Sequence, residues 1–506
     1  FLNSFLDYSA TILNKSPNSI KEYNYDIMSF LRFIKIHFNM TRETELEKLN
    51  KRFHSDSMEF IVVYGRRRVG KTALINEFVK DKKAIYYSAI NATAKDNLEV
   101  LSKAIYLYEN PEASEIPSFH SFDAAFNEIG RLAQNERIVF VIDELPYLAK
   151  SDESLISRLQ HLLDYQWKDS RLFFIVCGSS ISFMQKEVLS EKSPLFGRRT
   201  AQFHIMPLDY YDSHKMNPDL SEEENALIYG ITGGIAHYIN KLDVKTSIRD
   251  ALLDNFFDTS AYLYEEPANL LKQELREPAV YNSIITAIAN GATRLNEISA
   301  RVGMETNNCV KYLKPLMELG IIEKTEPVIY KESRRGIYQI TDNFFRFWYR
   351  FVPNNVSVIS ADRMSLIYDK AVDSYLSEYM GFIFEAMCRQ YLIRNMESLP
   401  FVFSEIGKWW GTHYKLKKEV KIDIVAVAPK ENNTVGNEYL IGSCKYTSEK
   451  VSIDELELIR EYAAAFVSGN DICHYYIFSK SGFTESLYEK QRKKEVSLIT
   501  LEDMYR

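Results

Sequence analysis

A glycine-rich octapeptide between a buried strand and a helix constrains the fold of this chain more than any other feature. Residues 60–64 are all apolar or aromatic, which is typical of a strand inside a parallel sheet. The octapeptide that follows reads Gly65, Arg66, Arg67, Arg68, Val69, Gly70, Lys71 and Thr72. Apolar residues at helical spacing continue over residues 72–80. This order of strand, glycine loop and helix is that of a phosphate-binding P-loop.

The spacing of the octapeptide has a physical reason. Glycines such as Gly65 and Gly70 let backbone N–H groups curl around phosphate oxygens. Lys71 would place a positive charge on the β and γ oxygens, and the Thr72 hydroxyl would ligate Mg²⁺ at the helix N-terminus. The strand and helix on either side argue against a chance match, so we expect ATP and Mg²⁺ as ligands.

The ends of two further strands supply the other expected site residues. Residues 138–142 form a buried strand that ends in Asp143 and Glu144. Behind a P-loop, Asp143 is expected to hold Mg²⁺ and Glu144 to orient or deprotonate the attacking water. The strand at 172–177 is followed by Ser179, which would act as a sensor of the γ-phosphate or simply belong to a strand-to-loop turn.

A pair of arginines follows these strands. In the segment 194–199, Arg198 is our choice for an arginine finger, a cation that stabilises charge in the transition state. The alternative is that Arg198 and its neighbour Arg199 are solvated surface residues.

The alternation of short apolar strands and helical patterns predicts an α/β fold with a parallel sheet covered by helices. Four segments are expected. They are a helical segment at 1–38, a P-loop ATPase domain with a helical lid at 40–264, a winged helix-turn-helix at 265–345, and a smaller α/β domain at 365–506.

Five separated motifs together resemble the archaeal-type ATPase family, which belongs to the AAA+/STAND class of P-loop proteins. They are the P-loop, Val-Ile-Asp-Glu-Leu-Pro-Tyr-Leu (141–148), Cys-Gly-Ser-Ser (177–180), Pro-Leu-Phe-Gly-Arg-Arg (194–199) and Ile-Thr-Gly-Gly-Ile-Ala-His-Tyr (231–238). The resemblance implies ATP hydrolysis. The family's opening box, thought to contribute to the adenine pocket, is reduced here to residues 42–46, and Ala236 stands where the family tends to have Pro.

The winged-helix candidate has a positioning helix at 295–301 and a recognition helix at 307–319, before an extended stretch around Arg334 and Arg335. On the recognition helix we expect four residues to face inward, Val310, Leu313, Leu316 and Met317, and four to face outward, Asn307, Asn308, Lys311 and Lys314. The outward side chains suit DNA phosphates and base edges. An intramolecular lid or a surface for a protein partner is the alternative.

The last domain has a helix over 371–393 and strands near 421–427, 439–444 and 474–477, and it resembles the restriction-endonuclease-like nuclease fold. That chemistry uses two carboxylates to hold Mg²⁺ and a lysine to assist the water. The corresponding residues are Glu385, Asp423, Ser443 and Lys445. Because a neutral hydroxyl replaces the second carboxylate, the resemblance implies a degenerate site that binds nucleic acid or acts as a scaffold.

DNA would have to bind through local basic patches, since the formal net charge of the chain is -7. Two clusters are candidates, Lys415, Lys417, Lys418 and Lys421, and Arg492, Lys493 and Lys494. The pair Trp409 and Trp410 would stack on a base or anchor the core.

Residues 1–38 resemble the first two helices of the SAM-like core-binding domain of tyrosine recombinases, and an ordinary helical hairpin is the alternative. The five cysteines show no Cys-x-x-Cys pair, and no apolar run reaches the ~20 residues that span a bilayer. We therefore expect reduced thiols, a cytoplasmic protein and no membrane partner.

Three functions compete at this stage. The first is an ATPase that acts on DNA or is regulated by it. The second is a nucleotide-gated switch that binds a protein partner or another copy of itself. The third is a Mg²⁺-dependent nuclease under ATPase control, which Ser443 disfavours.

Overall fold

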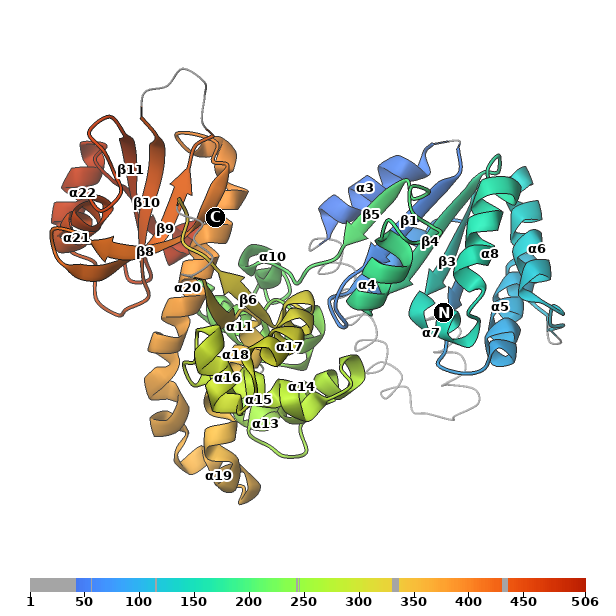
Figure 1. Cartoon of the computed structure of the whole chain (residues 1–506), viewed down its shortest axis with the longest axis horizontal. Helices are drawn as coiled ribbons and strands as arrows, with labels where there is room; N and C mark the ends of the chain where they lie inside the picture. The colour runs from blue at the N-terminus through green and yellow to red at the C-terminus, as the bar shows by residue number, and fades with distance from the viewer. Residues whose placement is uncertain are drawn as a thin grey trace, which may run out of the picture. The chain divides into compact units, whose positions relative to one another are not determined.

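The computed structural model describes residues 42–55, 57–113, 116–242, 244, 246–329, 336–429 and 436–506. The chain forms two compact units, one up to Met206 and one from Pro207 to the end (Figure 1). The segment 1–38, with its predicted recombinase-like helices, lies outside the described residues.

The first unit is built on a parallel sheet of β1 (Glu59–Tyr64), β2 (Ala84–Ser88), β3 (Ile138–Asp143), β4 (Leu172–Gly178) and β5 (Ala201–His204). The strand order is β2-β3-β4-β1-β5, and every pairing is parallel. The predicted α/β class and the predicted strands are confirmed.

Helices cover both faces of this sheet (Figure 1). One face packs against α5 (Ala94–Glu109) and α6 (Phe122–Asn135), the other against α3 (Glu43–Phe53) and α4 (Lys71–Val79). Alternate residues of β1 therefore enter different cores, with Phe60 in one and Ile61 in the other. Burial on both faces of the sheet explains why β1 is apolar or aromatic from Phe60 to Tyr64.

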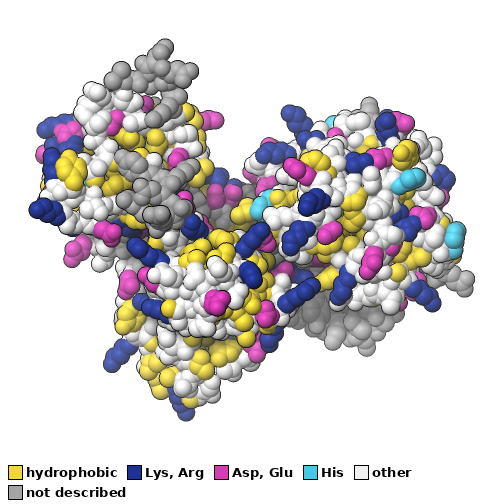
Figure 2. Space-filling view, in the orientation of Figure 1, with side chains coloured by type: hydrophobic (Ala, Val, Ile, Leu, Met, Phe, Trp, Pro, Cys, Tyr) yellow, Lys and Arg dark blue, Asp and Glu magenta, His cyan; other side chains and the backbone are white. Residues whose placement is uncertain are grey.

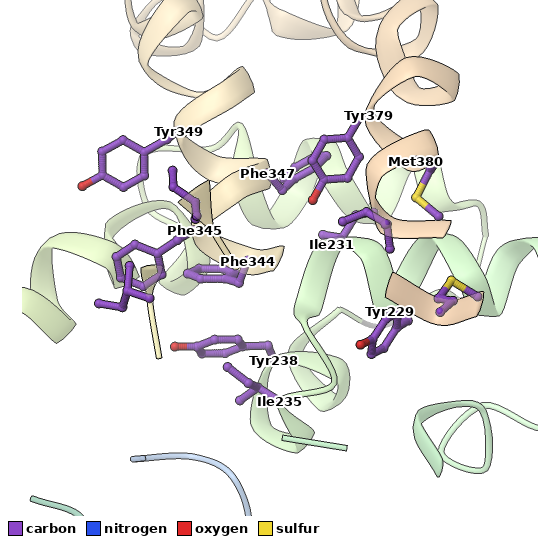
Figure 3. Close-up of a cluster of buried hydrophobic side chains, with 14 of the residues drawn as sticks. Tyr229, Ile231, Ile235, Tyr238, Phe344, Phe345, Phe347, Tyr349, Tyr379 and Met380 are labelled. Atoms are coloured by element: carbon purple, nitrogen blue, oxygen red, sulfur yellow. The ribbon is translucent and has the colours of Figure 1, made fainter. Parts of the chain in front are cut away.

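The second unit begins with helices that the sequence assigned to the ATPase domain. They are α10 (Tyr210–His214), α11 (Glu222–Thr232), α12 (Ala236–Lys241), α13 (Ile248–Phe256) and α14 (Tyr262–Glu274). Their core is shared with α18 (Asn343–Phe351) and α20 (Ser374–Arg394), and Figure 3 shows Tyr238 against Phe344, with ring centroids 4.3 Å apart. The predicted helical lid thus packs with C-terminal residues.

Three helices and a hairpin follow at the predicted winged-helix position. They are α15 (Pro278–Ala289), α16 (Leu295–Val302), α17 (Thr306–Glu318), β6 (Ile322–Thr325) and β7 (Ile337–Ile340), with β6 and β7 antiparallel. Arg334 and Arg335 lie outside the described residues.

The inward face predicted for α17 is half wrong. Leu313 and Leu316 are buried, but Val310 is 46% exposed and Met317 36% exposed. Cys309 is fully buried and completes the stripe at i, i+4 and i+7 with the two leucines, so the buried face is rotated away from Val310. The four residues predicted to face outward, Asn307, Asn308, Lys311 and Lys314, are all exposed.

The C-terminal sheet has the order β12-β11-β10-β9-β8. Its strands are β8 (Glu405–His413), β9 (Lys418–Val427), β10 (Glu438–Lys445), β11 (Ile472–Ser479) and β12 (Ser497–Thr500), of which β8 and β12 were not predicted. One face packs on α20 and the other on α21 (Ile453–Ala463) and α22 (Glu485–Arg492). In the described part of the chain, no helix is long and apolar enough to cross a membrane.

Candidate nucleotide-binding site

The loop between β1 and α4 needs glycine at both ends. Gly65 has a φ of 153°, and a Cβ there would overlap the carbonyl oxygen of Ile205. Gly70 caps the N-terminus of α4 with a φ of 96°, in the left-handed region that side chains disfavour. The backbone therefore turns tightly enough to direct N–H groups toward one point, as a phosphate cradle requires.

Lys71 lies across this loop. Its Nζ donates to the carbonyl oxygens of Gly65, at 3.0 Å, and of Arg66, at 2.8 Å. Burial lowers the pKa of Lys71, while the carboxylates of Asp143 and Glu144 act in the opposite direction. The ammonium group thus lies over the loop, close enough to Asp143 and Glu144 to interact electrostatically with both.

Thr72 and Asp143 meet as the sequence predicts. The Thr72 Oγ1 donates to Asp143 Oδ2 at 3.0 Å, from the first turn of α4 to the end of β3. A hydroxyl and a carboxylate are the hard oxygen ligands that Mg²⁺ takes in proteins, so this pair fits the ion.

Tyr86 is a member of this cluster that sequence reasoning missed. Its hydroxyl donates to the same Asp143 Oδ2 at 2.7 Å, and its pKa is raised, first by burial and then by Asp143. The only sequence signal was a tyrosine in the strand that proves to be the neighbour of β3.

Glu144 and Ser179 form a second contact at the same sheet edge. Glu144 has a φ of 56°, and its Oε2 accepts hydrogen bonds from the Ser179 hydroxyl, at 2.9 Å, and from the Ser179 N–H, at 3.3 Å. Ser179 therefore reaches the expected edge, but its partner in this structure is the predicted water-activating carboxylate.

The remaining arginines of the loop are anchored by neighbouring elements. Arg67 donates to the Tyr147 hydroxyl at 2.9 Å, Arg66 is 6% exposed, and Arg68 has a φ of 71°. Arg42, from the reduced opening box, is buried and donates to the carbonyl oxygens of Val69, at 3.1 Å, and of Met206. These contacts fix the loop against α3 and the segment after β5.

Arg198 does not join the site in this structure. Its Nε and Nη2 donate to the two Asp164 carboxylate oxygens at 2.7 and 2.8 Å. Its Nη1 donates to the Pro194 carbonyl at 2.8 Å. Hydrogen bonds from Arg198 accordingly lower the pKa of Asp164. The arginine-finger assignment stays a prediction, and Asp164, on the π-helix η1 (Leu162–Gln166), was not foreseen.

Comparison with known proteins shows the family to which the chain belongs. Residues 40–242 match the model of an ATPase domain found predominantly in Archaea, and residues 348–456 match a family of archaeal and bacterial proteins of unknown function. An uncharacterized protein of Methanocaldococcus jannaschii is 35% identical over 389 residues, covering 76% of this chain and 83% of the relative. The chain belongs to this family of archaeal ATPases.

Other matches of the chain are shorter or more remote. An uncharacterized ATP-binding protein of Methanocaldococcus jannaschii is 46% identical over 44 residues, 9% of this chain and 75% of that protein. The Walker-type ATPase of Pyrococcus abyssi aligns with a TM-score of 0.46 and 19% identity, covering 61% of this chain and 95% of that one. The Orc1 protein of Aeropyrum pernix, solved in complex with DNA, gives a TM-score of 0.33 and 12% identity, covering 63% and 94%.

Three of the four nuclease-like residues, Asp423, Ser443 and Lys445, lie on β9 and β10, and Glu385 lies on α20, which packs on the same sheet. Glu385 forms ion pairs with Lys408 and, at 2.9 Å, with Lys421. These lysines lower the pKa of Glu385 although burial acts to raise it. Asp423 accepts from the Cys444 N–H at 3.0 Å and lies 3.4 Å from Lys421 Nζ. Burial, and then Glu385, raise the pKa of Asp423.

Ser443, which stands where the nuclease fold has its second carboxylate, has an acidic neighbour that sequence analysis did not predict. Glu455, on α21, accepts from the Ser443 hydroxyl at 2.6 Å and pairs with Lys445 Nζ at 3.0 Å. A residue ten positions beyond the strand carries no local signal for such a contact. Within the described ranges, no group of three or more His, Cys, Asp or Glu residues is placed to hold a metal ion.

Proposed function

We propose that this chain hydrolyses ATP at the P-loop, with Lys71, Thr72 and Asp143 binding nucleotide and Mg²⁺. The observation that carries the proposal is the 3.0 Å contact between Thr72 Oγ1 and Asp143 Oδ2, which brings together the two oxygen ligands at the mouth of the loop. When bound, Mg²⁺ would neutralise charge on the phosphate oxygens. Lys71 adds a protein cation to the same oxygens, and the loop N–H groups orient them.

Glu144 is the proposed activator of water, and Ser179 regulates it in this proposal. Both hydrogen bonds from Ser179 go to Glu144 Oε2, so this oxygen is occupied and is less available to accept from the attacking water. Exchange of the Ser179 hydroxyl for water would release Glu144. The contact therefore favours slow basal turnover that a second ligand can raise.

DNA is the proposed second ligand. The exposed Asn307, Asn308, Lys311 and Lys314 form one polar face of α17, which suits phosphates and base edges. Figure 2 shows Lys and Arg side chains mixed with Asp and Glu over the visible face, so contact would be local, in keeping with the net charge of -7. A nucleotide-gated protein-binding switch is the alternative, and the exposed Val310 and Met317 on the same helix favour it.

The test is steady-state ATP turnover of the full chain, with and without duplex DNA. Lys71→Ala should reduce turnover to background. Lys80→Ala is the matched control, because Lys80 is an exposed residue at the C-terminal end of α4, and this variant should turn over ATP normally. Normal turnover in Lys71→Ala would refute the proposed ATPase site, whereas turnover that duplex DNA leaves unchanged would favour the protein-binding switch.

A second candidate is Mg²⁺-dependent cleavage of nucleic acid, favoured by Glu455, which sets a carboxylate beside Ser443 and Lys445. Glu455 and Asp423 would be the metal-binding carboxylates in that case. The test is cleavage of plasmid DNA in Mg²⁺ or Mn²⁺ by the chain and by its Asp423→Ala and Glu455→Gln variants. Equal cleavage by all three would assign the activity to a contaminant.

A further inference from the structure

Two contiguous hollows lie beside the hairpin β6–β7, inside the second compact unit: the smaller is lined by β7, α15, α18 and α20, and the larger reaches from the hairpin to β8 and β9 of the C-terminal sheet. Their volumes are about 330 Å³ and about 550 Å³. Both are lined by Thr293, Ile337, Gln339 and Phe382, so the hollows join around these residues. We call the joined hollows the hairpin groove. It is distinct from the P-loop, which belongs to the first unit.

The hairpin groove is basic in a chain that is acidic overall. Its lining includes five cationic side chains, Arg294, Arg346, Arg350, Lys408 and Lys421, against two acidic ones, Glu378 and Glu419. Glu378 is 3.5 Å from Arg350, Glu385, just outside the lining, pairs with Lys408 and Lys421, and Asp423 lies 3.4 Å from Lys421. Arg346 forms no ion pair with any described residue, so the groove retains positive charge where the whole molecule has a net charge of -7.

Arg346 holds an unused donor in this setting. Its Nη2 donates to the Ile340 carbonyl, and its guanidinium carbon lies 3.4 Å from the centroid of the Phe382 ring. Its Nε is buried and has no hydrogen-bond partner among the described residues. Burial lowers the pKa of Arg346 to about 10, which still leaves the group charged at neutral pH. An unsatisfied, charged donor of this kind is costly unless a ligand accepts from it.

Phe382 links this arginine to a second cationic centre. The Lys408 Nζ lies 4.4 Å from the centroid of the same ring, and Lys421 lines the larger hollow. The groove thus offers a cation in each hollow, one on either side of the residues that join them. Two separated cations match a ligand with more than one phosphate.

Trp410 adds an aromatic surface to the larger hollow. It is half-buried, on β8, and lines the groove beside Lys408. No described residue stacks on its ring or places a cation over it, whereas Trp409, the next residue, is buried and packs on Phe466 with ring centroids 4.7 Å apart. The sequence treated the two tryptophans alike, but only Trp410 is placed to stack on a ligand.

We propose that the hairpin groove binds a segment of single-stranded nucleic acid, with a phosphate at Arg346, another at Lys408 and Lys421, and a base stacked on Trp410. Cations that follow a backbone and an aromatic ring for the bases are the chemistry of single-strand binding. The inference rests on the proposed action on DNA and locates where an unpaired strand is held.

The experiment measures fluorescence anisotropy of a labelled thymidine oligonucleotide with the full chain over a series of salt concentrations. Trp410→Ala should weaken binding about 5- to 100-fold without changing the salt dependence, because a stacked base is lost but no phosphate contact. Arg346→Gln and Lys421→Gln should each lower the slope of log affinity against log salt by about 0.7, the value for one phosphate contact with a single strand. A melting curve shows whether Arg346→Gln remains folded. If it unfolds, Lys421→Gln alone tests the phosphate contact, because the Lys421 side chain is 49% exposed.

Two matched controls lie in loops next to strands of the same sheet, outside the groove lining. Tyr414→Ala removes an aromatic side chain that is 64% exposed, and Lys450→Gln removes an exposed lysine from the segment after β10, outside both candidate basic clusters. Both should bind the oligonucleotide as the unchanged chain does. If they weaken binding as much as Trp410→Ala and Lys421→Gln, the strand binds elsewhere on the sheet and the proposal is overturned.

Two further results would overturn the proposal. Thymidine monophosphate competing as well as the oligonucleotide would show that the groove takes a free nucleotide. Duplex binding without single-strand binding would assign DNA recognition to another surface, such as α17, and leave the proposed DNA-linked ATPase intact. Conversely, normal turnover in Lys71→Ala would remove the proposed ATPase site without affecting the binding result.

Discussion

The Tyr86 hydroxyl donates a 2.7 Å hydrogen bond to Asp143 Oδ2, the oxygen that also accepts from Thr72 at 3.0 Å. One carboxylate oxygen therefore serves two donors, one from the neighbouring strand β2 and one from α4. Such outer contacts orient a metal-binding carboxylate and tune its affinity for the ion. Tyr86 is thus a positioning residue for the expected Mg²⁺ site.

Tyr86→Phe should raise the Mg²⁺ concentration needed for half-maximal ATP turnover about 10-fold, the effect of losing a hydrogen bond that orients a metal ligand. Turnover at saturating Mg²⁺ should change less, because Asp143 itself remains. The measurement is a Mg²⁺ titration of turnover at fixed ATP. Tyr87→Phe is the control, since Tyr87 bonds to Asn97 and not to the site. Equal Mg²⁺ curves for Tyr86→Phe and the unchanged chain would show that Asp143 needs no support from Tyr86.

Ser179→Ala should raise basal turnover about fivefold, because one hydrogen bond contributes about 1 kcal/mol net and its loss frees Glu144. The adjacent Ser180→Ala is the control at the same strand end. If Ser179 instead senses the γ-phosphate, as one interpretation of the sequence has it, the variant should turn over more slowly. The sign of the change separates the two roles.

Gly65→Ala should destabilise the first unit by about 2–4 kcal/mol, because the new Cβ meets backbone that cannot move aside and the φ of 153° disfavours a side chain. Gly197→Ala is the control. Gly197 has a φ of 77° but open space around its Cβ position, so it should lose only the conformational part, about 1 kcal/mol. Thermal unfolding of both variants measures the difference. Equal losses of stability in Gly65→Ala and Gly197→Ala would show that the Ile205 backbone moves aside to accept the new Cβ.

The sequence predicted the P-loop region well because its signals are local. Strand β1 is buried on both faces and is apolar or aromatic from Phe60 to Tyr64, and Gly65 and Gly70 adopt the backbone angles that their residue type alone suggests. The sequence assigned Thr72 and Asp143 to one Mg²⁺ site, and their hydrogen bond places the two side chains together. The roles of Lys71, Thr72 and Asp143 toward nucleotide and Mg²⁺ stay predictions.

Other features depend on tertiary contacts that no local pattern carries. Val310 looks like a core residue, yet Cys309 takes the buried position because α17 is rotated by its packing on the neighbouring helices. Glu455 reaches Ser443 only because α21 folds back over β10. The helices after Pro207 join the C-terminal core through aromatic contacts such as Tyr238 with Phe344, across about a hundred residues.

Asp423→Asn should raise the melting temperature of the chain at pH 7. Burial and the nearby Glu385 raise the pKa of Asp423 in the folded state, so the charged form is disfavoured there relative to the unfolded chain. Stability from the protonated carboxyl is present below the ordinary pKa of about 3.9 and is lost as pH rises through the higher folded value. The asparagine keeps an oxygen that can accept from the Cys444 N–H and carries no charge.

Asp471→Asn should change the melting temperature at pH 7 in the opposite direction from Asp423→Asn. Against the effect of burial, hydrogen bonds from the Ser468 and Asn437 N–H groups lower the pKa of Asp471, so its charged form stabilises the fold above the ordinary pKa. This variant should melt at a lower temperature at pH 7. Its loss should vanish as pH falls through the folded pKa of Asp471, whereas the gain from Asp423→Asn should shrink as pH falls through the raised folded pKa of Asp423 and be gone below about pH 4. Melting curves between pH 3 and 8 decide both, and a lower melting temperature for Asp423→Asn at pH 7 would mean that its attraction to Lys421 outweighs burial.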